Sequence, residues 1–196
     1  MGVVILAASL LGCSVGVADA PVAGERIAGS LTELFEKALD MLHPLQVERE
    51  ALERAVRTGR IAPEDYEAAH LRFVQCMTQH GFQPAYRKTP EGLYIELSYS
   101  HVKDEEALKA ANMKCAQDTA VLESLYRTQQ ANPDLLADKR LVAIRCLKKG
   151  GFVDAAYTVE RFDEDYKTDD FPFNADEDGP NNCLAEAGYG YFTVSQ

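Results

Sequence analysis

The cysteines are the feature that most constrains how this 196-residue chain can fold. Three of the five open the same pattern: a cysteine, Leu or Met, three variable residues, a glycine and an aromatic residue. It occurs as CMTQHGF, CLKKGGF and CLAEAGY, beginning at Cys76, Cys146 and Cys183. Glycine in this place is typical of a helix end, because it readily adopts the left-handed backbone that closes the last turn. The sequence therefore predicts either copies of one duplicated unit or three helices with similar ends.

The spacing of the cysteines predicts how they pair. Leaving Cys13 aside, four remain, and four cysteines permit three pairings. None belongs to a C-x-x-C motif, so neither a thioredoxin-like redox site nor a zinc ribbon is indicated. Two sequence separations are nearly equal, which predicts two disulfides, Cys76–Cys115 and Cys146–Cys183. Loops of this size would contribute about 3–4 kcal/mol per disulfide.

The residues before Cys13 explain why it is left aside. Val3–Leu11 is apolar or small, as in the hydrophobic part of a signal peptide, and is too short to span a bilayer. It leads into Leu10-Leu11-Gly12-Cys13, which resembles the lipobox of bacterial lipoproteins. The resemblance implies a lipidated Cys13 carrying diacylglyceryl and a fatty acid such as palmitate. No Lys or Arg precedes the run, so a buried N-terminal helix or strand ending in a structural cysteine remains the alternative.

The lipobox resemblance implies a division of the chain. Residues 1–12 would be a signal peptide, residues 13–29 a lipidated flexible tether, and residues 30–196 a helical extracytoplasmic domain. The small residues of SVGVADAPVAG are typical of a tether. The protein would then lie on the extracytoplasmic face of the cell membrane, anchored by the lipid on Cys13.

A second resemblance covers about residues 55 to 190. The order TGRIAPEDYEAAHLRFVQCMTQHGF, LYIELSYS, KCAQD, RCLKKGGF and NNCLAEAGY is similar to a loosely defined group of small exported lipoproteins. These come from high-GC Gram-positive bacteria and share helices with the cysteine, glycine and aromatic pattern. The resemblance implies an exported, disulfide-bonded protein. The group carries no established activity.

Capping residues and periodicity predict the helices. One helix follows the capping box Ser30-Leu31-Thr32-Glu33, a second ends at Gly59, and a third runs from Pro63 to the Gly81 stop. We expect Asp104 to cap a further helix whose inner face extends from Leu108 to Leu122. Two more are expected, one from Asn132-Pro133 to Gly150-Gly151 and a short one around Cys183. VDAAYTVERFDEDY is compatible with a strand or a helix, and KTDDFPFNADEDGPNN reads as an acidic loop.

One segment predicts strands. FQPAYRK and LYIELSYS flank the turn TPEG, and Leu93, Ile95, Leu97 and Tyr99 alternate with polar residues or Tyr94. A hairpin with one face packed on helices is expected. The fold class is therefore mainly α with one small antiparallel β-hairpin (α+β), stapled by disulfides.

The net charge of −11 limits the partners. Nucleic acids are bound through clustered Lys and Arg, so nucleic acid is excluded as a partner. An acidic surface instead suits a basic protein of the cell envelope.

Two groups of residues resemble metal ligands. His70, Cys76, Met77 and His80, with Met113 and Cys115 nearby, offer the sulfur and imidazole that suit copper or zinc, although packing and a disulfide account for the same residues. Asn174, Asp176, Asp178 and Gly179 imitate the start of an EF-hand calcium loop. The acid required at position 12 is replaced by Ala185, so an acidic loop is favoured. No metal or other cofactor is predicted.

No catalytic motif is present in the sequence. The nucleophile elbow, S-x-x-K, H-E-x-x-H, P-loop and G-x-G-x-x-G patterns are all missing. The sequence thus favours a non-catalytic binding module of the cell envelope. The alternatives are a hydrolase of cell-wall glycan that uses two carboxylates, and a copper- or calcium-binding envelope protein.

Overall fold

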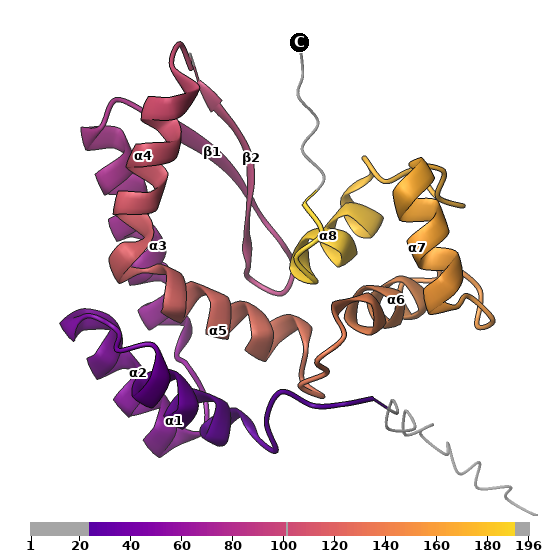
Figure 1. Ribbon diagram of the computed structural model, residues 1–196, viewed down its shortest axis with the longest axis horizontal. Helices are drawn as coiled ribbons and strands as arrows, with labels where there is room; N and C mark the ends of the chain where they lie inside the picture. The colour runs from indigo at the N-terminus through magenta and orange to yellow at the C-terminus, as the bar shows by residue number, and fades with distance from the viewer. Residues whose placement is uncertain (1–23, 101, 191–196) are drawn as a thin grey trace, which may run out of the picture.

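The computed structural model describes residues 24–100 and 102–190 (Figure 1). Cys13 and the expected signal peptide lie outside these residues. Within them the chain forms helices joined to one two-stranded antiparallel sheet, as the sequence predicts. In chain order the elements are α1 (Leu31–Met41), α2 (Gln46–Thr58), α3 (Pro63–Gln79), β1 (Gln83–Lys88), β2 (Tyr94–Ser100), α4 (Glu105–Cys115), the 3₁₀ turn η1 (Ala116–Asp118), α5 (Ala120–Ala131), α6 (Lys139–Lys149), α7 (Val159–Thr168) and α8 (Asp178–Glu186).

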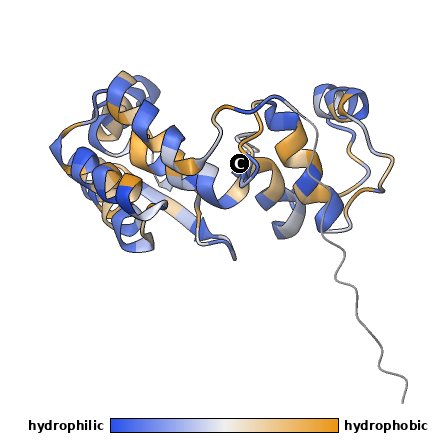
Figure 2. Cartoon of the chain, turned by 90° about the horizontal axis from the view of Figure 1, so that it is seen from below, coloured by the Kyte–Doolittle hydropathy of each residue, from blue (hydrophilic) through white to orange (hydrophobic). Residues whose placement is uncertain are grey.

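The elements form two lobes, each with its own core. The N-terminal lobe contains α1 to α5 and the hairpin, and the C-terminal lobe contains α6 to α8 (Figures 1 and 2). The first core gathers around Phe35, Leu52 and Tyr66, and the second around Leu147 and Phe162. A smaller cluster joins α3 to α4 beside the first disulfide. Among the described residues, no helix is long and apolar enough to span a membrane.

The three cysteine patterns end their helices in the same way. Gly81, Gly151 and Gly188 all have a positive φ, of 86°, 72° and 87°. In each case the aromatic residue after the glycine donates its backbone N–H to the carbonyl of the residue after the cysteine, at 2.8–3.0 Å. This is the Schellman arrangement. The residue that follows the cysteine is fully buried in all three patterns. Burial explains why this position holds an apolar side chain, Met77, Leu147 or Leu184.

The hairpin departs from the expected one-sided packing. Near its turn both faces are covered, because Tyr94 stacks on His70 of α3 while Ile95 is also buried. Farther from the turn Leu97 is 45% exposed, contrary to expectation. The strand register shifts between Ala85 and Tyr86, so the alternation in β2 does not correspond to one continuous packed face.

The helix expected to run from Asp104 to Leu122 is interrupted. Asp104 caps α4 as predicted, but α4 ends at Cys115, and α5 begins afresh after Thr119. The carboxylate of Glu48 in α2 accepts the N–H of Leu122 at 2.9 Å, so a side chain of another helix caps α5. A residue 74 positions away thus stabilises the start of α5. The local periodicity of the sequence does not indicate this helix start.

The prediction that Asn132-Pro133 starts a helix is wrong. Asn132 ends α5, and its side-chain amide bonds both the N–H and the carbonyl of Leu136, each at 2.9 Å. The next helix, α6, begins seven residues later at Lys139, where Asp138 caps the N–H of Arg140. The side chain of Asn132 therefore stabilises the connection between α5 and α6.

One undecided segment is helical, and the expected acidic loop KTDDFPFNADEDGPNN is helical only at its two ends. VDAAYTVERFDEDY contains α7, which begins after Thr158, whose hydroxyl accepts the N–H of Arg161. The expected acidic loop is shorter than predicted because α8 starts at Asp178.

Candidate functional site

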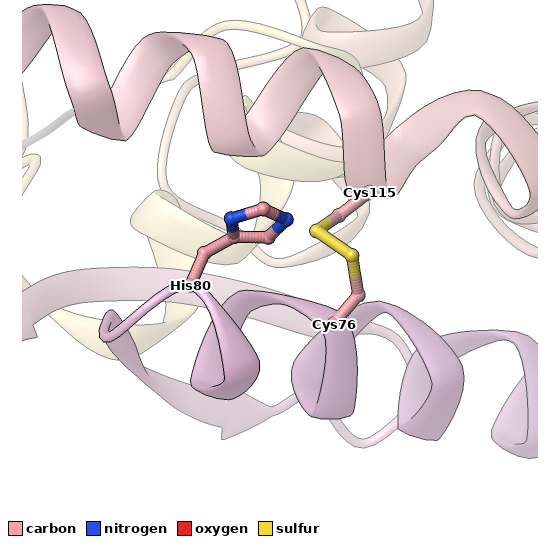
Figure 3. Close-up of side chains that lie close together, drawn as sticks. All are labelled: Cys76, His80 and Cys115. Atoms are coloured by element: carbon pink, nitrogen blue, oxygen red, sulfur yellow. A yellow bond between two sulfur atoms is a disulfide. The ribbon is translucent and has the colours of Figure 1, made fainter.

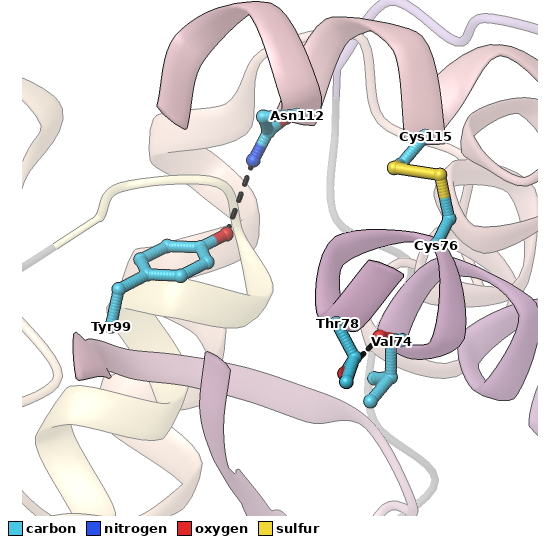
Figure 4. Close-up of a disulfide and its surroundings, with 6 residues drawn as sticks. All are labelled: Val74, Cys76, Thr78, Tyr99, Asn112 and Cys115. Carbon is cyan, nitrogen blue, oxygen red and sulfur yellow. Dashed lines mark hydrogen bonds between the residues drawn. A yellow bond between two sulfur atoms is a disulfide. The ribbon is translucent and has the colours of Figure 1, made fainter. Parts of the chain in front are cut away.

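The two predicted disulfides are both present. Cys76–Cys115 joins α3 to α4 with a Cα–Cα distance of 5.6 Å, and Cys146–Cys183 joins α6 to α8 with one of 5.4 Å. Beside the first bridge, Asn112 Nδ2 donates to Tyr99 Oη at 3.2 Å and ties α4 to β2 (Figure 4). Each lobe therefore carries one disulfide between two of its helices.

His80 lies next to the Cys76–Cys115 bridge. The sulfur atoms and an imidazole nitrogen of His80 all lie within 4.8 Å of one another (Figure 3). Cys115 is buried, Cys76 is half-buried, and His80 is exposed. Within the described part of the chain, this is the one group of three His, Cys, Asp or Glu side chains close enough to share a metal ion. The two sulfurs are bonded to each other, so this oxidised form offers no thiolate.

The other residues expected at that metal site lie elsewhere. Met77 is fully buried in the cluster between α3 and α4, where it packs with Phe73. Met113 is 66% exposed. His70 lies among tyrosines, so the sequence-based ligand set is reduced to His80 and the two cysteines.

His70 lies in an aromatic cluster between α3 and the hairpin. Its ring stacks on Tyr94 with centroids 3.7 Å apart and meets Tyr86 edge-on at 4.4 Å. Tyr66 stacks on Tyr126 at 4.2 Å, and its hydroxyl accepts the N–H of Tyr94. Burial lowers the pKa of His70 to about 4, so the imidazole is neutral near pH 7.

One acidic side chain, Glu123, approaches this cluster, and the charge of the buried Glu48 acts on Glu123. Glu123 Oε1 lies 3.9 Å from His70 Nδ1, and burial, aided by the charge of Glu48, raises the pKa of Glu123 to about 7. Burial also raises the pKa of the fully buried Glu48. Glu48 caps α5 and faces no solvent, so this pair does not have the arrangement of two carboxylates flanking a substrate cleft.

Sequence reasoning did not single out Glu48, although a signal was present. Ala51, Leu52 and Ala55 form the buried side of α2, and Glu48 precedes them at helical spacing on the same side. An acid on the apolar face of an amphipathic helix indicates a buried polar partner, here the start of α5.

Acidic residues concentrate in α7 and the segment that follows it. Residues 159–178 hold nine Asp and Glu and two Arg and Lys, and so account for seven of the eleven net negative charges. Eight of these acids are exposed. The exception is the buried Asp165, which accepts a hydrogen bond from Tyr157 Oη at 2.7 Å and forms an ion pair with Arg161 Nε at 2.7 Å. We call the exposed side chains of residues 159–178 the acidic face.

An open hollow adjoins the acidic face. Its lining combines aromatic and apolar side chains with one guanidinium and one carboxylate, and consists of Gly151, Phe152, Val153, Asp154, Ala156, Tyr157, Arg161 and Pro172. Phe152 is held by two glycines, since a Cβ at Gly150 or Gly179 would lie 2.3 or 2.4 Å from its ring. This open hollow thus places aromatic and apolar side chains next to exposed carboxylates.

The calcium-like segment does not fold as an EF-hand loop. Asn174 Oδ1 accepts the N–H of Asp176 at 3.1 Å, but Asp178 is the first residue of α8 and lies 3.4 Å from Arg87 Nε. Gly179 is inside the helix and not in a ligand-binding turn. The structure therefore does not bring Asn174, Asp176 and Asp178 into the arrangement that the motif requires.

Comparison with family models, with curated proteins and with solved structures found no match for this chain.

Proposed function

We propose that the chain is the extracytoplasmic domain of a membrane-anchored lipoprotein and acts as a non-catalytic binding module. The observation that carries the proposal is the pairing of all four described cysteines in two disulfides. Disulfides persist in oxidising compartments and are rare in the cytosol. Cys13 is the one cysteine left over, and it stands in the lipobox-like LLGC.

The acidic face supports a basic envelope protein as the partner. Its carboxylates would draw a basic partner toward the C-terminal lobe, and the hollow beside Phe152 and Tyr157 would take an apolar side chain of that partner. Charged rims steer association, whereas buried aromatic contacts supply most of the affinity.

The anchor is tested by the intact mass of the protein from its native membrane fraction, measured without reduction before and after thiol alkylation. We expect a mass that corresponds to a chain without residues 1–12 and with diacylglyceryl attached, and that alkylation does not change. A full-length, unlipidated mass that gains four or five alkyl groups would contradict it.

The binding surface is tested by charge reversal. In capture from envelope extracts, we expect Asp170→Lys/Asp176→Lys/Glu177→Lys to reduce recovery of basic proteins by about tenfold at low salt, because the long-range attraction is lost. The matched control reverses three exposed acids of the N-terminal lobe, Glu36, Glu53 and Glu64, and changes the net charge equally. Equal losses in both variants, or recovery unaffected by salt, would contradict a specific acidic face.

A further inference from the structure

The ends of α3 and α4 place two cysteine sulfurs and an imidazole together. Cys76 and His80 are four residues apart and so project from the same side of the end of α3, and Cys115 is the last residue of α4. Figure 3 shows the imidazole beside the sulfur–sulfur bond, with no element between them. An imidazole and two sulfurs in this arrangement match the donors of a zinc site with three protein ligands.

The helix end at Gly81 does not require a histidine at position 80. The residue four places after the cysteine is Gly150 in the second pattern and Ala187 in the third. All three patterns nevertheless form the same Schellman arrangement. The Cys146–Cys183 bridge is therefore an internal control with the same helix ends and no histidine.

Packing holds the ligands near one another independently of the sulfur–sulfur bond. Phe73 and Met77 of α3 pack against Ala111 of α4 in the cluster that surrounds the bridge. The bond from Asn112 to Tyr99 adds a polar tie between α4 and β2 (Figure 4). These contacts would keep the two cysteine backbones close after the bridge opens.

We propose that reduction of Cys76–Cys115 creates a zinc site formed by both thiolates and His80. A dithiol reductant supplies two electrons and two protons, becomes a disulfide itself, and leaves two cysteine thiols. Zn²⁺ then displaces the two thiol protons and binds both sulfurs and one imidazole nitrogen, with a water in the fourth position. Tetrahedral coordination with Zn–S bonds of about 2.3 Å places the sulfurs about 3.8 Å apart, which side-chain rotation supplies. The oxidised bridge excludes the ion, so the bridge controls metal binding.

The test uses the full chain carrying Cys13→Ser, so that the N-terminal thiol cannot compete. The chain is reduced with a phosphine under anaerobic conditions and titrated with Co²⁺ as a spectroscopic probe and then with Zn²⁺ against a chromogenic chelator. We expect one ion per chain, thiolate-to-cobalt charge-transfer absorption, and the intense visible bands of tetrahedral Co²⁺. The oxidised chain should show none of these.

His80→Ala is the decisive variant, and His43→Ala is its control, because His43 is an exposed histidine at the α1–α2 corner. His80→Ala should weaken zinc binding by more than about tenfold, since even second-shell partners of a metal are worth that much. His43→Ala should leave it unchanged. Equal binding by both variants, or cobalt spectra without thiolate bands, would overturn the proposal.

Unfolding of the reduced chain is monitored by circular dichroism in the same samples. If the reduced chain loses helix and Zn²⁺ restores it in the parent but not in His80→Ala, metal binding is coupled to folding and the proposal is supported. If Zn²⁺ restores helix equally in both, the Cys146 and Cys183 thiols suffice, and the proposal fails.

Discussion

At the scale of single residues, His70 and Glu123 show how burial decides charge. Their 3.9 Å approach would be an ion pair if both were ionised. Burial instead lowers the pKa of His70 to about 4 and raises that of Glu123 to about 7. Between these values both groups are neutral, so the contact is not a salt bridge near pH 6.

The raised pKa of Glu123 makes stability depend on pH. Its folded pKa is above the unfolded value of 4.5, so the penalty for ionising it is absent below pH 4.5, grows between pH 4.5 and 7, and is complete above pH 7. Glu123→Gln removes the penalty. We expect it to raise the free energy of unfolding by about 2–3 kcal/mol at pH 8 and to have little effect at pH 4.5, measured by urea denaturation.

The same titration checks this assignment. The protonation of His70 occurs in the parent and the variant alike, so it cancels in the difference between them. Glu53→Gln, at an exposed position of α2, should change stability at neither pH. A gain from Glu123→Gln that is equal at pH 4.5 and pH 8 would show that packing, and not charge, is responsible.

At the scale of elements, the glycines that end α3, α6 and α8 are placed by their backbone conformation. Gly81 has a φ of 86°, and an added Cβ would meet nothing within 4 Å. A substitution there consequently measures backbone strain alone. We expect Gly81→Ala to lower the free energy of unfolding by about 1–2 kcal/mol, and Gly81→Asn to cost less, because asparagine tolerates the left-handed conformation better.

Thermal or urea unfolding of the two variants separates the possibilities. Equal effects of alanine and asparagine would mean that tolerance of the left-handed conformation does not set the cost. An unchanged stability in Gly81→Ala would mean that the helix end rearranges.

The elements also show which features local sequence could predict. The ends at Gly59, Gly81 and Gly151 were predictable because glycine and its neighbours determine them within a few residues. The disulfides were predictable because the separation within each pair is nearly equal, 39 and 37 residues. The break before α5 was not, since Glu48 caps α5 from a distant helix. The helix start predicted at Asn132 was wrong because the side chain of Asn132 accepts the N–H of Leu136 in the connection between α5 and α6, and does not cap the start of a helix.

In the candidate sites, too, local features were predictable from the sequence and features that depend on distant residues were not. Cys76 and His80 were recognisable as a pair because four residues on a helix bring side chains to one side. His70 and Met77 share the segment but face the core, which ligand type alone does not reveal. The clustering of carboxylates in residues 159–178 is a property of composition, whereas the hollow beside them depends on long-range packing.

At the scale of the whole molecule, polar contacts join the two lobes. The hairpin turn lies beside α8 (Figure 1), where Arg87 donates to the side chains of Asn181 and Asn182. Arg127 of α5 donates to the carbonyls of Tyr94 and Ala185, each at 3.3 Å, and so links the hairpin to α8. These contacts connect two separate apolar cores.

Arg127 should therefore couple the lobes in folding. We expect Arg127→Ala to lower amide protection in α6 to α8 by about tenfold, while α1 to α3 keep theirs, in native-state hydrogen exchange. Arg57→Ala, at an exposed position of α2, is the control. A uniform loss across both lobes would mean that Arg127 stabilises one cooperative unit instead.

The first described residues have a mechanical consequence. The chain from Gly24 to Ile27 lies antiparallel to the α5–α6 connection, held by Glu25 O to Ala137 N at 2.8 Å and Ile27 N to Leu135 O at 2.9 Å. Tension that enters through Gly24 therefore reaches the molecule between its lobes. It meets these two backbone hydrogen bonds before it reaches α1, so this short pairing would open before either core.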